Sequence, residues 1–138
     1  ELLEKDKKYT IDEFYNFAKI IEEKRYILKN LLTDLKKKGN KIYAYSAPAK
    51  GNTLLNYFGI DKALIDKSVE INEMKIGRYL PQSHIPITRE SKEDLPDYYL
   101  LLSHNYTEEI IRKNQKVIKK GVKFIVPFPE IQIIGDSK

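Results

Sequence analysis

From residue 41 to residue 134 the sequence alternates short apolar runs with stretches of helical periodicity. The run at 98–102 is apolar without interruption, which is typical of a strand buried on both faces of a parallel sheet. Helices between such strands act as the crossovers that parallel pairing needs. The pattern therefore predicts an α/β fold, a Rossmann-like parallel sheet of about four to five strands flanked by helices. The predicted strands cover residues 41–45, 64–70, 98–102, 122–126 and 131–134.

Two helices are predicted between these strands. The first begins at Asn52 and ends at Gly59, and the second begins at Asn105 and ends at Gly121. The segment 72–86 is predicted to be irregular because glycine and proline interrupt it.

A long amphipathic helix is expected ahead of this unit, over residues 10–39. Thr10 and Glu13 have the spacing of a capping box, and Gly39 supplies a stop. Such a helix exceeds the usual length of about 8–20 residues, so we expect it to reach toward another part of a longer parent chain. The start at Glu1 rather than methionine also suggests a piece of a longer protein. Apolar residues recur at helical spacing at Phe14, Phe17, Ala18, Ile21, Leu28, Leu31, Leu32 and Leu35.

The composition limits the class of protein. The chain has 138 residues, a length that fits one domain over 1–138. It has no cysteine, which excludes disulfides, thiolate metal sites and a cysteine nucleophile. Its net charge of +5 is spread along the predicted helices, so we expect no nucleic-acid partner. No apolar run approaches the roughly 20 residues that cross a bilayer, so we expect no membrane partner and a cytoplasmic location.

The turn after the first predicted strand is the first candidate binding site. Ligands of open α/β sheets bind outside the carboxyl ends of the strands. Ser46, Ala47 and Gly51 are small enough for a ligand to approach the backbone, Asn52 opens a helix whose free N–H groups favour an anion, and Lys50 adds a positive charge. The order of residues matches neither the dinucleotide fingerprint nor the P-loop, so an ordinary strand–helix turn is the alternative.

Further candidates lie after the second strand. Glu70 lies 19 residues beyond Gly51, close to the spacing at which Rossmann units place a carboxylate on ribose hydroxyls. In the irregular segment, Arg78 has the shape to bind a diphosphate, and Tyr79 and His84 can stack or hydrogen-bond. The alternatives are a solvated carboxylate for Glu70 and a histidine bonded to backbone for His84.

His104 and Asn105 follow the strand at 98–102 and are also candidates, although Asn105 can be a plain N-cap. No G-x-S-x-G motif accompanies the serines and histidines, and the two histidines lack the spacing of a zinc site. We therefore expect no catalytic residue and no metal ligand in this chain.

Several blocks of sequence carry a family resemblance. Residues 45–57 read Tyr-Ser-Ala-Pro-Ala-Lys-Gly-Asn-Thr-Leu-Leu-Asn-Tyr, and the blocks Gly77–Pro81, Ser83–Ile87, Leu95–Tyr98 and Phe124–Pro127 follow in order. Over roughly residues 10–134, the chain resembles the C-terminal domain of the S-adenosylmethionine-dependent sugar C-methyltransferases, which methylate a carbon of a nucleotide-linked deoxysugar.

The resemblance implies a Rossmann-like domain that helps to hold a nucleotide-diphosphate sugar. The turn Ser46–Asn52, the pair Arg78 and Tyr79, and His84 would line a cleft facing a methyltransferase domain, which is either part of the parent chain or a separate subunit. S-adenosylmethionine is implied for the parent enzyme, and this domain is expected to bind no cofactor itself. The proton-abstracting residues belong to the other domain, so this chain alone is expected not to catalyse methyl transfer.

Two other interpretations stay open. One is a freestanding dinucleotide-binding or nucleotide-binding Rossmann domain, which the missing G-x-G-x-x-G motif disfavours. The other is a structural interaction module that docks through the helix at 10–38.

Overall fold

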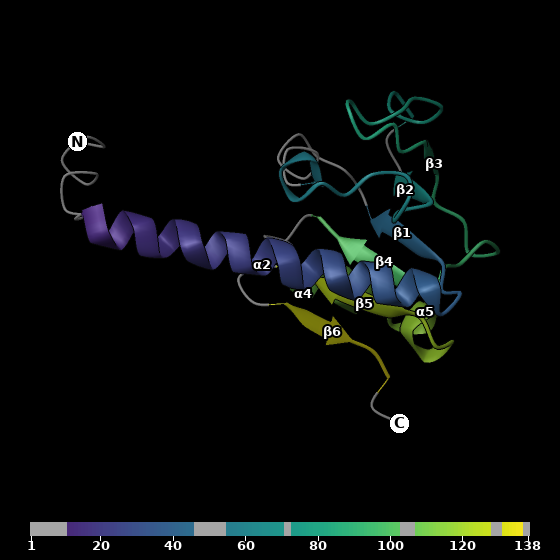
Figure 1. The fold of residues 1–138 in the computed structure, drawn as a ribbon. Helices are drawn as coiled ribbons and strands as arrows, with labels where there is room; N and C mark the ends of the chain where they lie inside the picture. Colours follow the sequence, from purple (N-terminus) through teal and green to yellow (C-terminus); the bar gives the residue numbers. More distant parts are fainter. Residues whose placement is uncertain (1–10, 46–54, 71–72, 103–106, 128–130, 137–138) are drawn as a thin grey trace, which may run out of the picture.

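The computed structural model describes residues 11–45, 55–70, 73–102, 107–127 and 131–136, and in this part of the chain six strands form one sheet (Figure 1). The strands are β1 (Ile42–Tyr45), β2 (Lys67–Glu70), β3 (Ile87–Arg89), β4 (Tyr98–Leu101), β5 (Lys123–Val126) and β6 (Gln132–Ile134). The helices are α2 (Ile11–Lys37), α4 (Thr107–Lys113) and α5 (Gln115–Lys119), and residues 55–58 are also helical.

The strand order is β3-β2-β1-β4-β5-β6, with β1 to β5 parallel and β6 antiparallel to β5. The predicted mixed α/β fold is confirmed, with two corrections. The sheet has six strands rather than four to five, because β3 was missed: three residues after a proline give too short a pattern. The last strand is not parallel, because residues 127–131 are too few for the crossover of about a dozen residues that parallel pairing needs.

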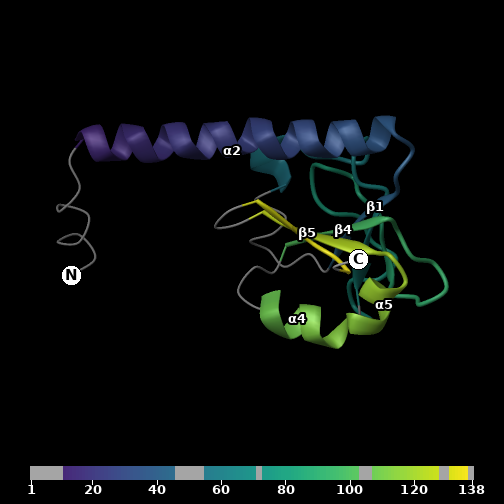
Figure 2. The same cartoon turned by 90° about the horizontal axis from the view of Figure 1, so that it is seen from below.

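Helices cover both faces of the sheet, as Figure 2 shows, with α2 on one side and α4 and α5 on the other. The first face buries one apolar cluster, which includes Leu32 of α2, Phe58 and Leu100 of β4. The second face buries another, which includes Tyr99 of β4 and Ile118 of α5. Successive residues of a strand point to opposite faces, so β4 contributes to both clusters.

The C-terminal half of α2 packs on the first face. Leu28, Leu32 and Leu35 are buried at intervals of four and three, the spacing of one helix face. Tyr26 and Ile27 are exposed on the same helix. The predicted capping box lies at the edge of the described residues, and the expectation that this helix reaches toward another part of a longer chain stays a prediction. No helix in the described ranges is long and apolar enough to cross a membrane.

Helices end at the glycines where the sequence predicts stops. Gly39 donates its N–H to the Lys36 carbonyl at 3.0 Å, and the next N–H binds the Leu35 carbonyl at 3.0 Å. This pair of bonds is a Schellman motif, which requires the left-handed φ of +88° that Gly39 adopts. Gly59 and Gly121 make the same pair of bonds, so all three predicted stops are confirmed.

The helix predicted between Asn105 and Gly121 is wrong in one respect, because Asn114 divides it into α4 and α5. Asn114 is buried, and its Nδ2 donates to the Ile110 carbonyl at 2.8 Å and to the Tyr45 hydroxyl at 3.2 Å. A side chain that bonds the preceding turn competes with the regular helical pattern, which explains the break.

Candidate functional site

The strand order creates a switch point between β1 and β4. From β1 the chain proceeds outward through β2 to β3, and it then returns to add β4 on the other side of β1. The two strands pair in parallel up to Tyr45 and Leu101, so their carboxyl ends meet at one edge of the sheet. In open α/β sheets this edge is where ligands bind. The segments that follow these strands lie outside the described residues, and with them the candidates Ser46, Ala47, Lys50, Gly51, Asn52, His104 and Asn105.

Glu70 is the last residue of β2 and belongs to the same edge of the sheet. Its side chain is only 10% exposed, and a carboxylate oxygen lies 3.9 Å from Lys75 Nζ. The alternative of a solvated strand-end carboxylate is therefore wrong. Arg89, which stands opposite Glu70 in the register, pairs with Glu73 instead, at 2.7 Å between Nη2 and Oε2.

A half-buried tyrosine lies at the end of β1, at a position where the sequence indicates no site residue. The Tyr45 hydroxyl accepts a hydrogen bond from Asn114 Nδ2 at 3.2 Å and lies 3.4 Å from both carboxylate oxygens of Glu90. Its ring packs edge-on against Tyr99 and Phe124, with centroids 5.2 and 5.8 Å apart. Burial raises the pKa of Tyr45; the Asn114 bond opposes this shift and Glu90 adds to it. The hydroxyl therefore stays protonated at neutral pH and donates to Glu90.

The segment predicted to be irregular contains an ordered hairpin. Residues 77–80 run antiparallel to 85–87, and the Leu80 N–H donates to the Ile85 carbonyl at 2.8 Å. Leu80 and Ile85 are both buried, which fastens the hairpin to the first face of the sheet. At its tip, the His84 N–H donates to the Leu80 carbonyl at 3.0 Å.

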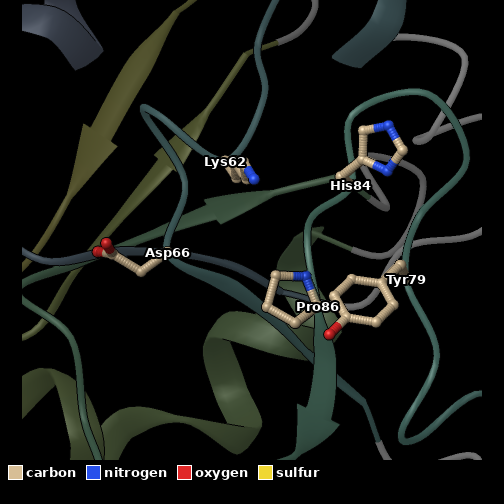
Figure 3. Close-up of a pocket in the computed structure, with 5 residues that line it drawn as sticks. All are labelled: Lys62, Asp66, Tyr79, His84 and Pro86. Carbon is tan, nitrogen blue, oxygen red and sulfur yellow. The ribbon is translucent and has the colours of Figure 1, made fainter.

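Two predicted residues of this hairpin, Tyr79 and His84, line one pocket of about 510 Å³ (Figure 3). Lys62, Asp66 and Pro86 complete its described lining. Asp66 directly precedes β2 and Pro86 directly precedes β3, so the pocket lies toward the amino ends of these strands. Neither Lys62 nor Asp66 belongs to a recognisable motif, and only the fold brings them beside the hairpin.

The structure thus separates residues that the sequence grouped together. Tyr79 and His84 share the pocket, whereas Glu70 lies at the opposite end of β2 and is not part of its lining. Arg78 is exposed and also lies outside the lining. The His84 side chain is exposed rather than packed in the core.

Comparison with known proteins shows the family of this chain. The family model of the C-methyltransferase C-terminal domain matches residues 1–129. The chain belongs to this family. It is also 35% identical over 124 residues to the C-methyltransferase NovU of Streptomyces niveus, an alignment that covers 88% of the chain. It spans only about a third of that relative's length, since the alignment covers 30% of NovU.

This C-methyltransferase C-terminal domain offers hydrogen-bonding groups rather than a metal centre in the ranges that the structure describes. There, no three histidine or acidic side chains are grouped so that they could hold a metal ion. Among the described residues, the Glu70 carboxylate and the Tyr45–Glu90–Asn114 cluster lie near the carboxyl edge. Carboxylates of this kind accept hydrogen bonds from the hydroxyl groups of a ligand. Hydroxyls accept hydrogen bonds from these groups and also donate to them.

Proposed function

We propose that this domain helps to hold a nucleotide-diphosphate sugar for methylation of a sugar carbon by a separate methyltransferase domain, in the parent chain or in another subunit. Membership of the C-methyltransferase C-terminal domain family carries the proposal. S-adenosylmethionine would be bound by that other domain, and there it supplies the methyl group. No residue of the present chain is proposed to take the proton from the sugar, so the domain is inactive alone.

The carboxyl edge of β1 and β4 supports this role. A diphosphate needs positive charge and free N–H groups, and the sequence predicts both in the turn from Ser46 to Asn52, through Lys50 and an expected helix start. That turn follows β1 directly, and His104 follows the neighbouring β4. We propose that the diphosphate binds at these two segments.

Glu70 is proposed to orient the sugar or ribose hydroxyls. The carboxylate is nearly buried and lies 3.9 Å from Lys75 Nζ, and carboxylate oxygens accept hydrogen bonds from the hydroxyls of a diol. A carboxylate fixed in this way costs little further ordering when the ligand binds.

Titration calorimetry of the chain with thymidine, uridine, guanosine and cytidine diphosphate sugars tests the proposal. We expect weak binding, with a dissociation constant in the millimolar range, and a loss of about fivefold or more in Lys50→Ala because one charge-assisted contact is removed. Lys92→Ala is the matched control, since Lys92 is an exposed lysine of the crossover 90–97, and it should bind as the unchanged chain does.

The same titration includes a chain that contains the methyltransferase domain. Absence of binding to every sugar nucleotide at millimolar concentration in that longer chain contradicts the proposal. Thermal protection by a nicotinamide dinucleotide, with none from the sugar nucleotides, instead supports the freestanding dinucleotide-binding interpretation.

The interaction module remains a second candidate because α2 exposes large apolar side chains. Ile20, Tyr26 and Ile27 are 50%, 66% and 55% exposed. In this interpretation, the double variant Tyr26→Ser and Ile27→Ser no longer assembles with the methyltransferase domain, as measured by gel filtration. Lys50→Ala changes neither assembly nor ligand binding. Loss of sugar-nucleotide binding in Lys50→Ala with intact assembly favours the first candidate.

A further inference from the structure

The pocket beside the hairpin lies away from the edge of the sheet where the proposed sugar-nucleotide site is. Its walls include Asp66 and Pro86, which directly precede the parallel strands β2 and β3. The proposed site lies past the opposite, carboxyl ends of the strands. The pocket volume of about 510 Å³ falls within the range of small-molecule sites.

The charges around the pocket favour an anion. Asp66 accepts from Lys36 Nζ at 2.9 and 3.1 Å and from the Ile42 N–H at 3.2 Å, so its negative charge is already compensated. Lys62 is exposed, and none of the ion pairs between described residues involves it. In the view of Figure 3 its ammonium group lies between Asp66 and His84. The lysine ammonium offers a positive charge and the imidazole an N–H donor to a ligand.

One wall of the pocket is an exposed aromatic surface. Tyr79 is 65% exposed, although its backbone pairs with Pro86 in an antiparallel bridge. Figure 3 shows the tyrosine ring beside the proline ring. A large ring held at the surface next to a rigid proline offers a face on which a planar ligand group can stack.

The hairpin tip is fixed before any ligand arrives. The Ser83 N–H donates to the Pro81 carbonyl at 2.7 Å, and Gln82 and His84 have φ values of 67° and 59°. Residues other than glycine rarely adopt this left-handed backbone conformation. Those that do are often found at ligand sites. Ser83, which lies between Gln82 and His84, is only 4% exposed, so the tip is packed against the protein interior.

We propose that this pocket is a second binding site, for a small organic anion that carries a planar ring. The anionic group contacts Lys62 and His84, and the ring stacks on Tyr79. The site does not depend on Lys50 or on Glu70, and it assigns Tyr79 and His84, which the family resemblance groups with the sugar nucleotide, to a separate ligand.

Phenyl phosphate is a suitable probe because it joins a planar ring to a small anion. The chain has two histidines, so the imidazole C–H signals can be followed by NMR, and His84→Asn identifies the His84 signal because asparagine tolerates left-handed backbone. We expect the His84 signal to shift with saturation at millimolar phenyl phosphate. Lys62→Ala should weaken this response at least fivefold, and the matched control Lys92→Ala should leave it unchanged.

The two halves of the probe are tested apart. Inorganic phosphate and phenol should each bind at least fivefold more weakly than phenyl phosphate, and Tyr79→Ala should remove the difference between phenyl phosphate and inorganic phosphate. An equal response to inorganic phosphate in the unchanged chain overturns the proposal, as does a Lys62→Ala variant that binds normally.

Lys50→Ala separates this inference from the proposed function. The His84 response should persist in Lys50→Ala, whether or not that variant still binds sugar nucleotides. Loss of the His84 response in Lys50→Ala shows that the pocket belongs to the sugar-nucleotide site, which overturns the inference of a second site and leaves the proposed function standing.

Discussion

At the scale of single residues, Asp94 links the crossover 90–97 to Tyr43 of β1 and Lys67 of β2. Its carboxylate accepts from the Tyr43 hydroxyl at 2.7 Å and pairs with Lys67, whose Nζ lies 4.8 Å from the centre of the Tyr43 ring. The bond from Lys67, followed by that from Tyr43, lowers the pKa of Asp94. Burial, together with the bond to Asp94, raises the pKa of Tyr43. Both shifts favour a charged carboxylate beside a neutral phenol.

Asp94 therefore makes stability depend on pH on the acid side. Because its pKa is lower in the folded chain than the unfolded value of about 3.9, its contribution is present above that value and is lost as the pH falls below about 4. We expect Asp94→Asn to lower the urea midpoint at pH 7, by an amount equivalent to less than about 1 kcal/mol for a partly exposed pair. At pH 3 the variant and the unchanged chain should differ much less.

Glu93→Gln serves as the control for this comparison, since Glu93 is an exposed neighbour. It should lower the midpoint at neither pH. If Asp94→Asn lowers the urea midpoint equally at pH 3 and pH 7, the contribution of the aspartate to stability comes from its packing and not from its charge.

At the scale of elements, Asn114 sets how α4 and α5 meet β1. Its Nδ2 bonds both the Ile110 carbonyl of α4 and the Tyr45 hydroxyl at the end of β1. The Tyr45 hydroxyl in turn reaches Glu90 on the crossover. One buried amide thus connects the helical layer, a central strand and the crossover near the carboxyl edge.

Removing this amide takes one hydrogen bond from the Tyr45 hydroxyl and one from the Ile110 carbonyl, which keeps its bond from the Asn114 backbone N–H. We expect Asn114→Ala to lower the free energy of unfolding by about 1–3 kcal/mol, measured by urea denaturation, because a buried side chain loses two hydrogen bonds worth about 0.5–1.5 kcal/mol each. Gln115→Ala is the matched control: Gln115 makes a similar bond to the Ile111 carbonyl at 3.0 Å but is exposed, so its loss should cost no more than about 0.5 kcal/mol. Equal losses in the two variants contradict this role for Asn114.

At the scale of the whole molecule, one sheet is shared by two apolar clusters on opposite faces. Leu32 of α2 is fully buried in the first, and Ile118 of α5 is 4% exposed in the second. Because β1, β4 and β5 contribute side chains to both clusters, loss of either layer uncovers the same sheet. The described part of the domain should therefore unfold as one unit.

Alanine substitutions on the two faces of the sheet test whether the domain unfolds as one cooperative unit. Leu32→Ala and Ile118→Ala should each lower the free energy of unfolding by about 2–5 kcal/mol. The double variant should lose their sum to within about 0.5 kcal/mol, since the sites lie on opposite faces and share no partner. Circular dichroism and tyrosine fluorescence should report one coincident transition in each single variant, because the chain has ten tyrosines and no tryptophan. Two separate transitions in either variant contradict a single unit.

Much of this fold was predictable because the signals are local. The strand at 98–102 is recognisable from an unbroken apolar run, and the glycines that end the helices are recognisable because only a left-handed residue completes a Schellman motif. β3 escaped prediction because its three residues follow a proline and derive their order from pairing with β2. The helix break at Asn114 escaped prediction because the apolar periodicity does not reveal the bonds of its side chain, to the Ile110 carbonyl and to the Tyr45 hydroxyl 69 residues away.

The candidate site was predictable only where it follows from chain order. Strand ends are fixed by the strands, so Glu70 could be assigned to the carboxyl edge in advance. Lys62 and Asp66 could not be assigned to a pocket with His84, because no motif joins residues from two different connections.

The sequence by itself determined the alternation of strands and helices, the helix stops and the family, because each depends on residues that are close together along the chain. Only the tertiary structure decided the direction of β6, the position of β3 and the separation of the hairpin pocket from Glu70. These depend on which distant segments lie side by side, and that is decided by burying two apolar faces against one sheet while keeping its polar groups paired.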